Sequence, residues 1–307
     1  MKRSSFVKAS LLSVAIPSLG FSNELVTRKK NPLRFAHLTD IHVKSGIVPE
    51  TGMTKALHQV QQSKVKVDFI INGGDAIWDA LEADKASTRA QFDIFNSILK
   101  NNNSLPIHHC IGNHDIWGWF SKTDGLNSDN QYGKQWIVDE FQMPKRYYSF
   151  QKSKWHFIVL DSTQLNPAGG YIAKIDEEQL EWLKQTLQNI PKENYICIVS
   201  HIPILSICAG LFFEKTESNG DRLFKRNLMH IDAIDLKKLF IEYPNIKVCI
   251  SGHIHLQDEL EYLGVKYYCN GAVCGGWWKG KFQEFAPAYA VMELHDDGTS
   301  SRTMYTY

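Results

Sequence analysis

The 307-residue sequence predicts an α/β (α+β) fold in which two β-sheets pack together and carry helices on their outer sides. Three observations lead to this prediction. Strand-like and helix-like segments alternate in the front half of the chain, strand-like segments dominate after His255, and short polar clusters follow several of the strands. The 43% of apolar residues is enough to bury one large core.

The predicted strands are runs of β-branched and apolar residues that end at polar or glycine-containing segments. In chain order they are Arg34–Thr39, Val67–Ile71, Ile107–Ile111, Trp155–Asp161, Tyr195–Ser200, Ile246–Ser251, Val265–Cys269, Tyr289–Leu294 and Arg302–Tyr307.

Three helices are expected between these strands. Residues 84–99 carry phenylalanines and aliphatic residues at helical spacing, and Asp176-Glu-Glu-Gln179 reads as a capping box that opens an amphipathic helix. A third helix, residues 232–243, stops before Pro244. The long polar stretch Leu205–His230 is expected to be a functional loop or lid, because spacers of this length are uncommon inside compact domains.

The first 22 residues are predicted to be an export signal, because Lys2, Arg3 and Lys8 precede a mildly apolar stretch. A disordered N-terminal tail is the alternative. Residues 23–32 are then a linker and residues 33–307 a single domain of a periplasmic or secreted protein. No other segment is apolar over the roughly 20 residues that a membrane span needs, so the mature chain is expected to lack one.

The charge balance argues against a nucleic-acid-binding protein. The chain has 34 basic and 33 acidic residues, and removing residues 1–22 takes away three basic residues and no acidic ones, which leaves 31 against 33, or −2. Strong nucleic-acid binding requires clustered Lys and Arg. A small-molecule substrate is therefore expected, and the oligomeric state is left open.

The six cysteines give no sign of a zinc module, because no pair has C-x-x-C spacing. Four of them sit in strand-like runs, where free cysteine behaves as a small hydrophobe. Cys208 and Cys274 lie in loop-like segments. No structural disulfide is expected, although a bond between these two stays open in an exported protein.

Five polar clusters in order along the chain carry the chemistry. They are Asp40-Ile-His42, Gly74-Asp75, Gly112-Asn113-His114-Asp115, His201 and Gly252-His253-Ile-His255. Residues i and i+2 of an extended chain share a face, so each Asp-x-His or His-x-His pair can approach one ion. Asp75 has two carboxylate oxygens and is the natural bridge between two metals, and Asn113 offers an amide oxygen that a hard cation accepts. Asp-x-His or Gly-Gly-Asp alone is weak evidence, Gly-Asn-His-Asp after a strand is stronger, and Gly-His-x-His is stronger still. All five clusters in this order leave little room for coincidence.

The clusters resemble the calcineurin-like metallophosphoesterase superfamily over residues 34–255. The resemblance implies a four-layer αββα sandwich of two mixed β-sheets flanked by helices. It also implies a first metal on Asp40, His42, Asp75 and His255, and a second on Asp75, Asn113, His201 and His253. His114 would be the catalytic acid or charge stabiliser, with Asp115 orienting it.

The expected activity is metal-dependent hydrolysis of a phosphodiester or phosphomonoester. Two ions about 3.5–4 Å apart can turn a bridging water into a hydroxide nucleophile for in-line attack at phosphorus. Donors that are Asp, Asn and His suit manganese, iron or zinc and do not choose among them. The alternatives are a scaffold protein that kept this fold after losing catalysis, and a nuclease of the same superfamily. No ligand is missing, and the near-neutral charge disfavours the nuclease.

Two details bear on the subgroup. The Gly-Asn-His-Asp block is similar to that of bacterial cyclic-nucleotide-phosphodiesterase-like members. Trp78 stands where purple acid phosphatases place a ligating Tyr, so a ferric site of that kind is not expected.

Substrate choice is expected to depend on Trp117, Trp119 and the Gly275–Lys279 loop, whose indoles could stack a base or merely close the rim of the site. Likewise Arg222, Lys225 and Arg226 could reach a phosphate or form a solvated face.

Overall fold

A computed structural model describes residues 31–213 and 215–307 of the chain. The predicted export signal and residues 23–30 of the predicted linker lie outside the described residues, so both stay predictions. In the described part of the chain, no helix is both long and apolar enough to cross a membrane.

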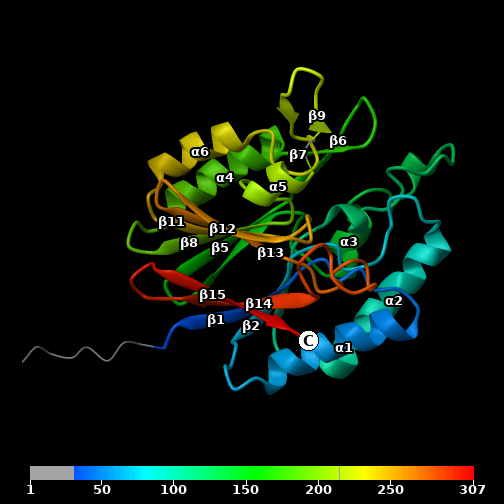
Figure 1. Ribbon diagram of the computed structural model, residues 1–307, viewed down its shortest axis with the longest axis horizontal. Helices are drawn as coiled ribbons and strands as arrows, with labels where there is room; N and C mark the ends of the chain where they lie inside the picture. The colour runs from blue at the N-terminus through cyan, green and yellow to red at the C-terminus, as the bar shows by residue number, and fades with distance from the viewer. Residues whose placement is uncertain (1–30, 214) are drawn as a thin grey trace, which may run out of the picture. The chain divides into compact units, whose positions relative to one another are not determined.

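Two mixed β-sheets form the centre of the domain (Figure 1). The five-stranded sheet has the order β15-β14-β1-β2-β3, and its members are β1 (Leu33–Leu38), β2 (Phe69–Asn72), β3 (Ile107–His109), β14 (Ala288–Leu294) and β15 (Ser300–Thr306). Strands β1, β2 and β3 are parallel, whereas β14 runs antiparallel to both β1 and β15. The carboxyl ends of β1, β2 and β3 therefore meet at one edge.

The second sheet has six strands in the order β12-β13-β11-β8-β5-β4. They are β4 (Tyr148–Lys152), β5 (Trp155–Leu160), β8 (Tyr195–Ser200), β11 (Ile246–Ser251), β12 (Gln257–Tyr262) and β13 (Val265–Asn270). Its four central strands are parallel, and antiparallel β4 and β12 close the two edges.

Helices cover the outer face of each sheet (Figure 1). Helices α1 (Ile47–Gln62), α2 (Lys85–Asn102) and α3 (Gln135–Glu140) pack on the five-stranded sheet, and α4 (Glu177–Asn189) and α6 (Ala233–Glu242) pack on the six-stranded one. Alternate residues of the two sheets, such as Phe35, Phe69 and Phe157, face each other in the layer between them. The predicted four-layer αββα sandwich is therefore confirmed.

All nine predicted strands are present, with ends that differ from the prediction by at most two residues. The capping residues are also as expected: Asp84 accepts a hydrogen bond from Ser87 N and opens α2, and Asp176 accepts one from Gln179 N and opens α4. Helix α1 and strands β4 and β12 are elements that the sequence did not predict.

The stretch Leu205–His230 is more ordered than a plain loop. It contains helix α5 (Ile207–Phe212), whose N-cap Ser206 accepts from Ala209 N, and a short hairpin of β9 (Lys215–Thr216) and β10 (Arg222–Leu223). A second small hairpin pairs β6 (Thr163–Leu165) with β7 (Tyr171–Ala173). Strand β7 is joined to the segment that follows the β9–β10 hairpin by one backbone hydrogen bond, from Ala173 N to Arg226 O.

Candidate metal centre

The polar clusters lie where the parallel strands of both sheets end. Asp40 and His42 follow β1, Asp75 follows β2, Asn113 follows β3, His201 follows β8, and His253 and His255 follow β11. One contact of the segment after β11 joins the ends of the two sheets, because His253 N donates to the Asp40 carboxylate at 2.9–3.0 Å. Within the six-stranded sheet, Gly252 N donates to His201 O at 3.0 Å. The predicted residues thus come together in one place.

The backbone at this place is strained. Five of the predicted ligands have positive φ angles, a conformation that is uncommon for residues with a side chain. They are Asp40 (54°), His42 (47°), Asp75 (53°), His253 (73°) and His255 (58°). Strained conformations of this kind persist where the surrounding structure holds them, and they gather at functional sites. Each chain segment leaves its strand in a sharp turn that aims the donor atoms inward.

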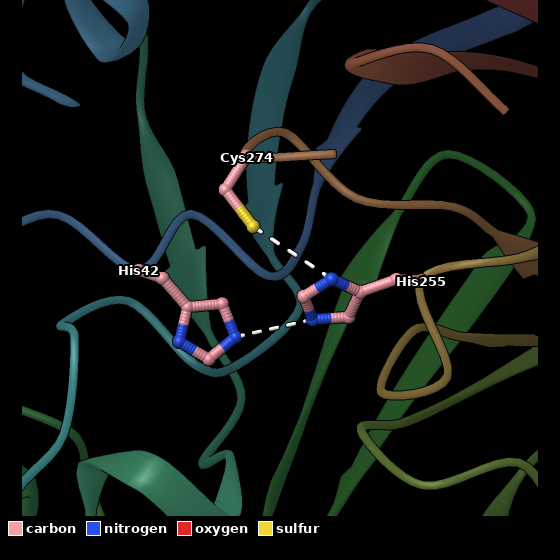
Figure 2. A group of neighbouring side chains, drawn as sticks. All are labelled: His42, His255 and Cys274. Atoms are coloured by element: carbon pink, nitrogen blue, oxygen red, sulfur yellow. Dashed lines mark hydrogen bonds between the residues drawn. The ribbon is translucent and has the colours of Figure 1, made fainter. Parts of the chain in front are cut away.

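The first group of donors is Asp40, His42, Asp75 and His255. His255 Nε2 lies 3.4 Å from Asp40 Oδ1, and His42 Nε2 lies 3.4 Å from Asp75 Oδ2. The two imidazoles face each other through their Nε2 atoms, 3.2 Å apart (Figure 2). These residues are almost completely buried. Two carboxylates and two imidazoles converging in the interior are a donor set that fits a divalent cation.

The second group is Asp75, Asn113, His201 and His253. Two buried donor atoms of this group, Asn113 Oδ1 and His253 Nδ1, have no hydrogen-bond partner within the described residues, and His201 Nε2 lies 3.2 Å from Asp75 Oδ2. Buried polar atoms are almost always paired, so two unpaired donor atoms in one place are typical of a site that binds a ligand. Ligand atoms of Asp75, His201 and His253 lie within 4.8 Å of one another. A metal ion would satisfy all of these atoms.

The orientation of the four imidazoles comes from backbone carbonyls. In each ring, the nitrogen that points away from the centre is within hydrogen-bond distance of a carbonyl oxygen, which can only accept, so that nitrogen carries the proton. The four pairs are His42 Nδ1 with Trp78 O (3.3 Å), His201 Nδ1 with Gly73 O (2.9 Å), His253 Nε2 with Asn227 O (2.7 Å) and His255 Nδ1 with Gly275 O (2.7 Å). In the neutral form of each ring, the remaining nitrogen keeps a lone pair that faces the centre, as metal ligands require.

The buried carboxylates and imidazoles of the centre shift one another's pKa values. Burial would raise the pKa of Asp75, but neighbouring histidines, His201 foremost, hold it well below its usual value. Burial would lower the pKa of His201, but the charge of Asp75 outweighs it and raises that pKa to about 9. For His42, burial dominates and lowers the pKa to about 3. Ionised carboxylates in a buried site need positive charge nearby, which either protonated histidines or divalent metal ions can supply.

His114 lies beside the centre, but its hydrogen-bond partner differs from the predicted one. Its ring centroid is 5.1 Å from that of His42, and its Nδ1 is 3.0 Å from Asp79 Oδ1. Burial lowers the pKa of His114, but Asp75 and the hydrogen bond to Asp79 outweigh burial and raise it above the usual value. Asp79 therefore holds the ring, and the prediction that Asp115 orients His114 is wrong.

Asp115 instead organises the backbone around Asp75. Its two carboxylate oxygens accept hydrogen bonds from four amides, those of Gly112 (2.9 Å), Asp75 (2.9 Å), Ala76 (2.8 Å) and Ile77 (3.3 Å). Adjacent residues of a short 3₁₀ turn point in different directions, and Asn113–Asp115 form such a turn. The side chain of Asp115 is directed away from the imidazole of His114 because the turn places it under the segment after β2.

Cys274 is a neighbour of the centre that the sequence did not assign. Its Sγ lies 3.7 Å from His255 Nδ1, which is the nitrogen that donates to Gly275 O (Figure 2). The thiol thus faces one ring nitrogen of His255, and His42 faces the other. Cys208 and Cys274 are both buried free thiols in this structure.

The aromatic residues divide into two kinds. Trp117 is buried in the core under α2 and α3 and donates from Nε1 to Ala83 O, so it closes the interior rather than the site. Trp119 packs at the edge of the same core and faces Lys134. Trp277 is different, because its ring centroid is 4.0 Å from that of His42. Arg222, Lys225 and Arg226 are exposed in and after the β9–β10 hairpin.

Sequence reasoning missed two side chains around the centre, Asp79 and Tyr171. Asp79 is four residues after Asp75, and a polar residue in a segment that leaves a buried strand is a usable signal. Trp277 belongs to the Gly275–Lys279 loop, whose indoles the sequence already indicated as candidates for stacking. Tyr171 gives no sequence signal, yet its buried hydroxyl bonds to Asn227 and the charge of Asp75 helps to raise its pKa, after burial itself.

Known proteins share this arrangement of sequence and fold. The family model described as calcineurin-like phosphoesterase matches residues 33–257, which is most of the chain. The chain belongs to the calcineurin-like phosphoesterase family. Members of the family hydrolyse phosphoric esters, and the protein is accordingly a phosphoric ester hydrolase of the metallophosphoesterase type.

Curated relatives of this phosphoesterase carry consistent names. A 3′,5′-cyclic-nucleotide phosphodiesterase of Nostoc sp. is 24% identical over 283 residues, covering 88% of this chain and 91% of its own. The 3′,5′-cyclic adenosine monophosphate phosphodiesterase CpdA of Haemophilus influenzae is 23% identical and covers 90% and 91%. Its counterpart in Escherichia coli K12 is 27% identical over 155 residues, about half of each chain.

Solved structures agree with the fold. A dimetal phosphatase from Danio rerio superposes with a TM-score of 0.62 at 15% identity, covering 91% of this chain and all of the other. The GAP50 protein of Plasmodium gives a TM-score of 0.53 at 20% identity, with coverage of 90% and 85%. These identities establish a common fold only.

Proposed function

We propose that this phosphoesterase is a phosphodiesterase with a dinuclear metal centre, and that 3′,5′-cyclic nucleotides are its substrate class. The observation that carries the two-metal part is the position of Asp75. Its Oδ2 lies 3.4 Å from His42 Nε2 in the first group and 3.2 Å from His201 Nε2 in the second. One carboxylate thus serves both groups, as a bridging ligand must.

The donor set is consistent with two similar ions. Asp40, His42, Asp75 and His255 would hold the first, and Asp75, Asn113, His201 and His253 the second. Oxygen and imidazole donors without thiolate fit manganese, iron or zinc. When bound, the two ions supply an activated bridging water and contacts for the phosphate oxygens.

The residues of the chain perform the other steps. The leaving oxygen of the ester needs a proton, and His114 is within reach of the centre and keeps a proton to higher pH than an ordinary histidine. Asp79 binds His114 Nδ1, so that Nε2 is free to donate. Asp115 keeps Asp75 in place through the backbone amides, and Asp75 Oδ1 accepts from His114 N at 2.8 Å, which links the ligand to the acid.

The substrate class rests on the named relatives, because the metal centre alone treats most accessible phosphate esters alike. For two of the relatives the alignment covers about nine-tenths of the relative's length, and both are named as phosphodiesterases of 3′,5′-cyclic nucleotides. A cyclic diester is a single small molecule, in keeping with the expected small-molecule substrate. These relatives support a diester over a monoester.

The test uses chelated protein that is reloaded with manganese. Four substrates are compared: 3′,5′-cyclic AMP, bis(p-nitrophenyl) phosphate, p-nitrophenyl phosphate and 5′-AMP. We expect two manganese ions per chain and turnover of both diesters well above that of the monoesters. Asp75→Asn should lose both ions and all activity, whereas the exposed Asp93→Asn should match the wild type. One ion per chain, or faster monoester hydrolysis, would overturn the corresponding part of the proposal.

We also propose that the protein acts outside the cytoplasm, on the strength of the basic and apolar pattern of residues 1–22. N-terminal sequencing of the protein from fractionated cells tests this. Cleavage near Ser22 in the exported fraction is expected, and an intact Met1 in the cytoplasmic fraction would refute it.

A further inference from the structure

Two consecutive tryptophans after β13 occupy a strained loop at the mouth of the metal centre. Trp277 and Trp278 both have positive φ angles, 55° and 61°. The loop is closed by hydrogen bonds from Trp278 N to Cys274 O (2.9 Å) and from Gly276 N to Gly280 O (2.8 Å). Such backbone conformations are costly for residues with a side chain, so the surrounding structure must hold these two in place.

Trp278 is the anchor of the loop. Its Nε1 donates to His42 O at 2.9 Å. Its ring lies directly on the backbone of helix α1, where a Cβ added at Gly52 would come within 2.0 Å of it. Both contacts use the side of the loop that faces α1. The neighbouring side chain, Trp277, therefore projects to a different surface.

That surface is the metal centre. The Trp277 ring lies 4.0 Å from His42 and 5.4 Å from His255, at interplanar angles of 38° and 29°, and 5.2 Å from His114 at 80°. The ring of Trp78 lies at a steep angle to it, 71°, with the two ring centroids 5.1 Å apart. The indole contacts two predicted ligands of the first metal and the predicted acid, yet it stays partly exposed to solvent. A tryptophan that only filled the core would be buried, as Trp117 is.

We propose that Trp277 is a specificity-determining residue that stacks on the planar ring of the substrate, a nucleobase, while the phosphate occupies the metal centre; this rests on the proposed function. Stacking on an aromatic side chain suits any base, because every base has a π-face. An exposed indole next to the phosphate position offers such a surface, and Trp278 fixes its position in advance, which lowers the entropic cost of binding. The enzyme would then discriminate between phosphate esters that carry a planar base and those that do not.

The experiment compares ligands that differ only in the base. Binding of 5′-AMP and of ribose 5-phosphate to manganese-loaded protein is measured by calorimetry, for the wild type, Trp277→Leu, Trp277→Phe and Lys279→Ala. Leu and Phe are not β-branched and take the positive φ no worse than Trp. Lys279 is an exposed residue of the same loop and serves as the matched control.

We expect Trp277→Leu to weaken the binding of 5′-AMP about tenfold, equivalent to about 1.4 kcal/mol. Its affinity for ribose 5-phosphate should stay within twofold of the wild-type value. Trp277→Phe should recover most of the loss, and Lys279→Ala should bind as the wild type. In turnover of 3′,5′-cyclic AMP, the Leu variant should raise KM more than it lowers kcat, with manganese content unchanged.

Three results would overturn the inference: equal wild-type affinity for the two ligands, an equal loss for both in Trp277→Leu, or a loss that Trp277→Phe does not recover. The binding arm does not require turnover. If the wild type hydrolysed bis(p-nitrophenyl) phosphate but no cyclic nucleotide, the proposed substrate class would fail. The comparison of 5′-AMP with ribose 5-phosphate would still decide the role of Trp277.

Discussion

The replacement of Asp115 by Asn separates two roles for this residue. If Asp115 oriented His114, the variant would fold normally and lose only proton transfer. The structure instead has its carboxylate accepting four backbone N–H groups around Asp75, with no exposed surface. Asn has nearly the same shape, but its NH₂ group donates and cannot accept. Two of the four N–H groups would lose their acceptor and face another donor.

The size of the effect follows from that count. Leaving one buried donor unpaired costs about 1–3 kcal/mol, so two cost about 2–6 kcal/mol. The total stability of a domain is typically about 5–15 kcal/mol. Asp115→Asn should therefore lower the midpoint of urea unfolding substantially. It should also weaken metal binding, because one of the two Asp115 oxygens holds Asp75 N together with Gly112 N.

The control is Asp79→Asn, which removes the actual partner of His114. The Asp79 side chain is partly exposed, and its carboxylate accepts one backbone hydrogen bond, from Leu81 N, which the Asn oxygen can also accept, so stability and metal content should stay near those of the wild type. Asp79 raises the pKa of His114, so its loss should lower that pKa and move the basic limb of the kcat profile to lower pH. The reasoning would be refuted if Asp115→Asn kept wild-type stability and metal content and shifted the pH profile instead.

Three further outcomes are expected. Chelation should abolish activity and manganese should restore it; metal at 100 times its Kd should also stabilise the fold by about 2.7 kcal/mol, and a fully active metal-free protein would contradict the metal centre. His114→Ala should lower kcat by about 10²–10⁴-fold at nearly unchanged metal content, and a parallel loss of metal would make the residue structural. Gly112→Ala should destabilise the protein by at least ~1–3 kcal/mol, because its Cβ would lie 2.1 Å from Asp75 N and Oδ1; normal unfolding and metal content would disprove this close packing.

The sequence predicted the central strands because these are buried on both faces. Strands such as Tyr195–Ser200 and Ile246–Ser251 are continuous apolar runs, which parallel strands in the middle of a layered fold require. The ligands were predictable for the same reason, since a polar residue at the end of such a run stands out.

The missed elements have weak patterns. Helix α1 follows Gly46 without a side-chain cap, and its first two apolar residues, Ile47 and Val48, are exposed. Strand β12 is an edge strand of sequence Gln-Asp-Glu-Leu-Glu-Tyr, with charges where alternation of apolar residues would be sought. Neither segment differs clearly from a polar connection when read alone.

The roles around the centre were harder to predict than the ligands. Asp115 is next to His114 in sequence, but the 3₁₀ turn separates their side chains, and Asp79 arrives from another segment. Contacts between segments 35 residues apart depend on how loops close over the strand ends. The local sequence pattern does not show which distant segment will supply the contact.

Backbone carbonyls hold all four imidazoles, and this affects which residues can be substituted without disturbing the centre. A carbonyl oxygen is present whatever side chain its residue carries, so the proton positions of His42 and His253 do not depend on the identities of Trp78 and Asn227. These positions can change freely in evolution as long as the local chain path survives. Saturation mutagenesis at Asn227 should then yield many variants with wild-type manganese affinity, with Pro as the expected exception because it alters that path.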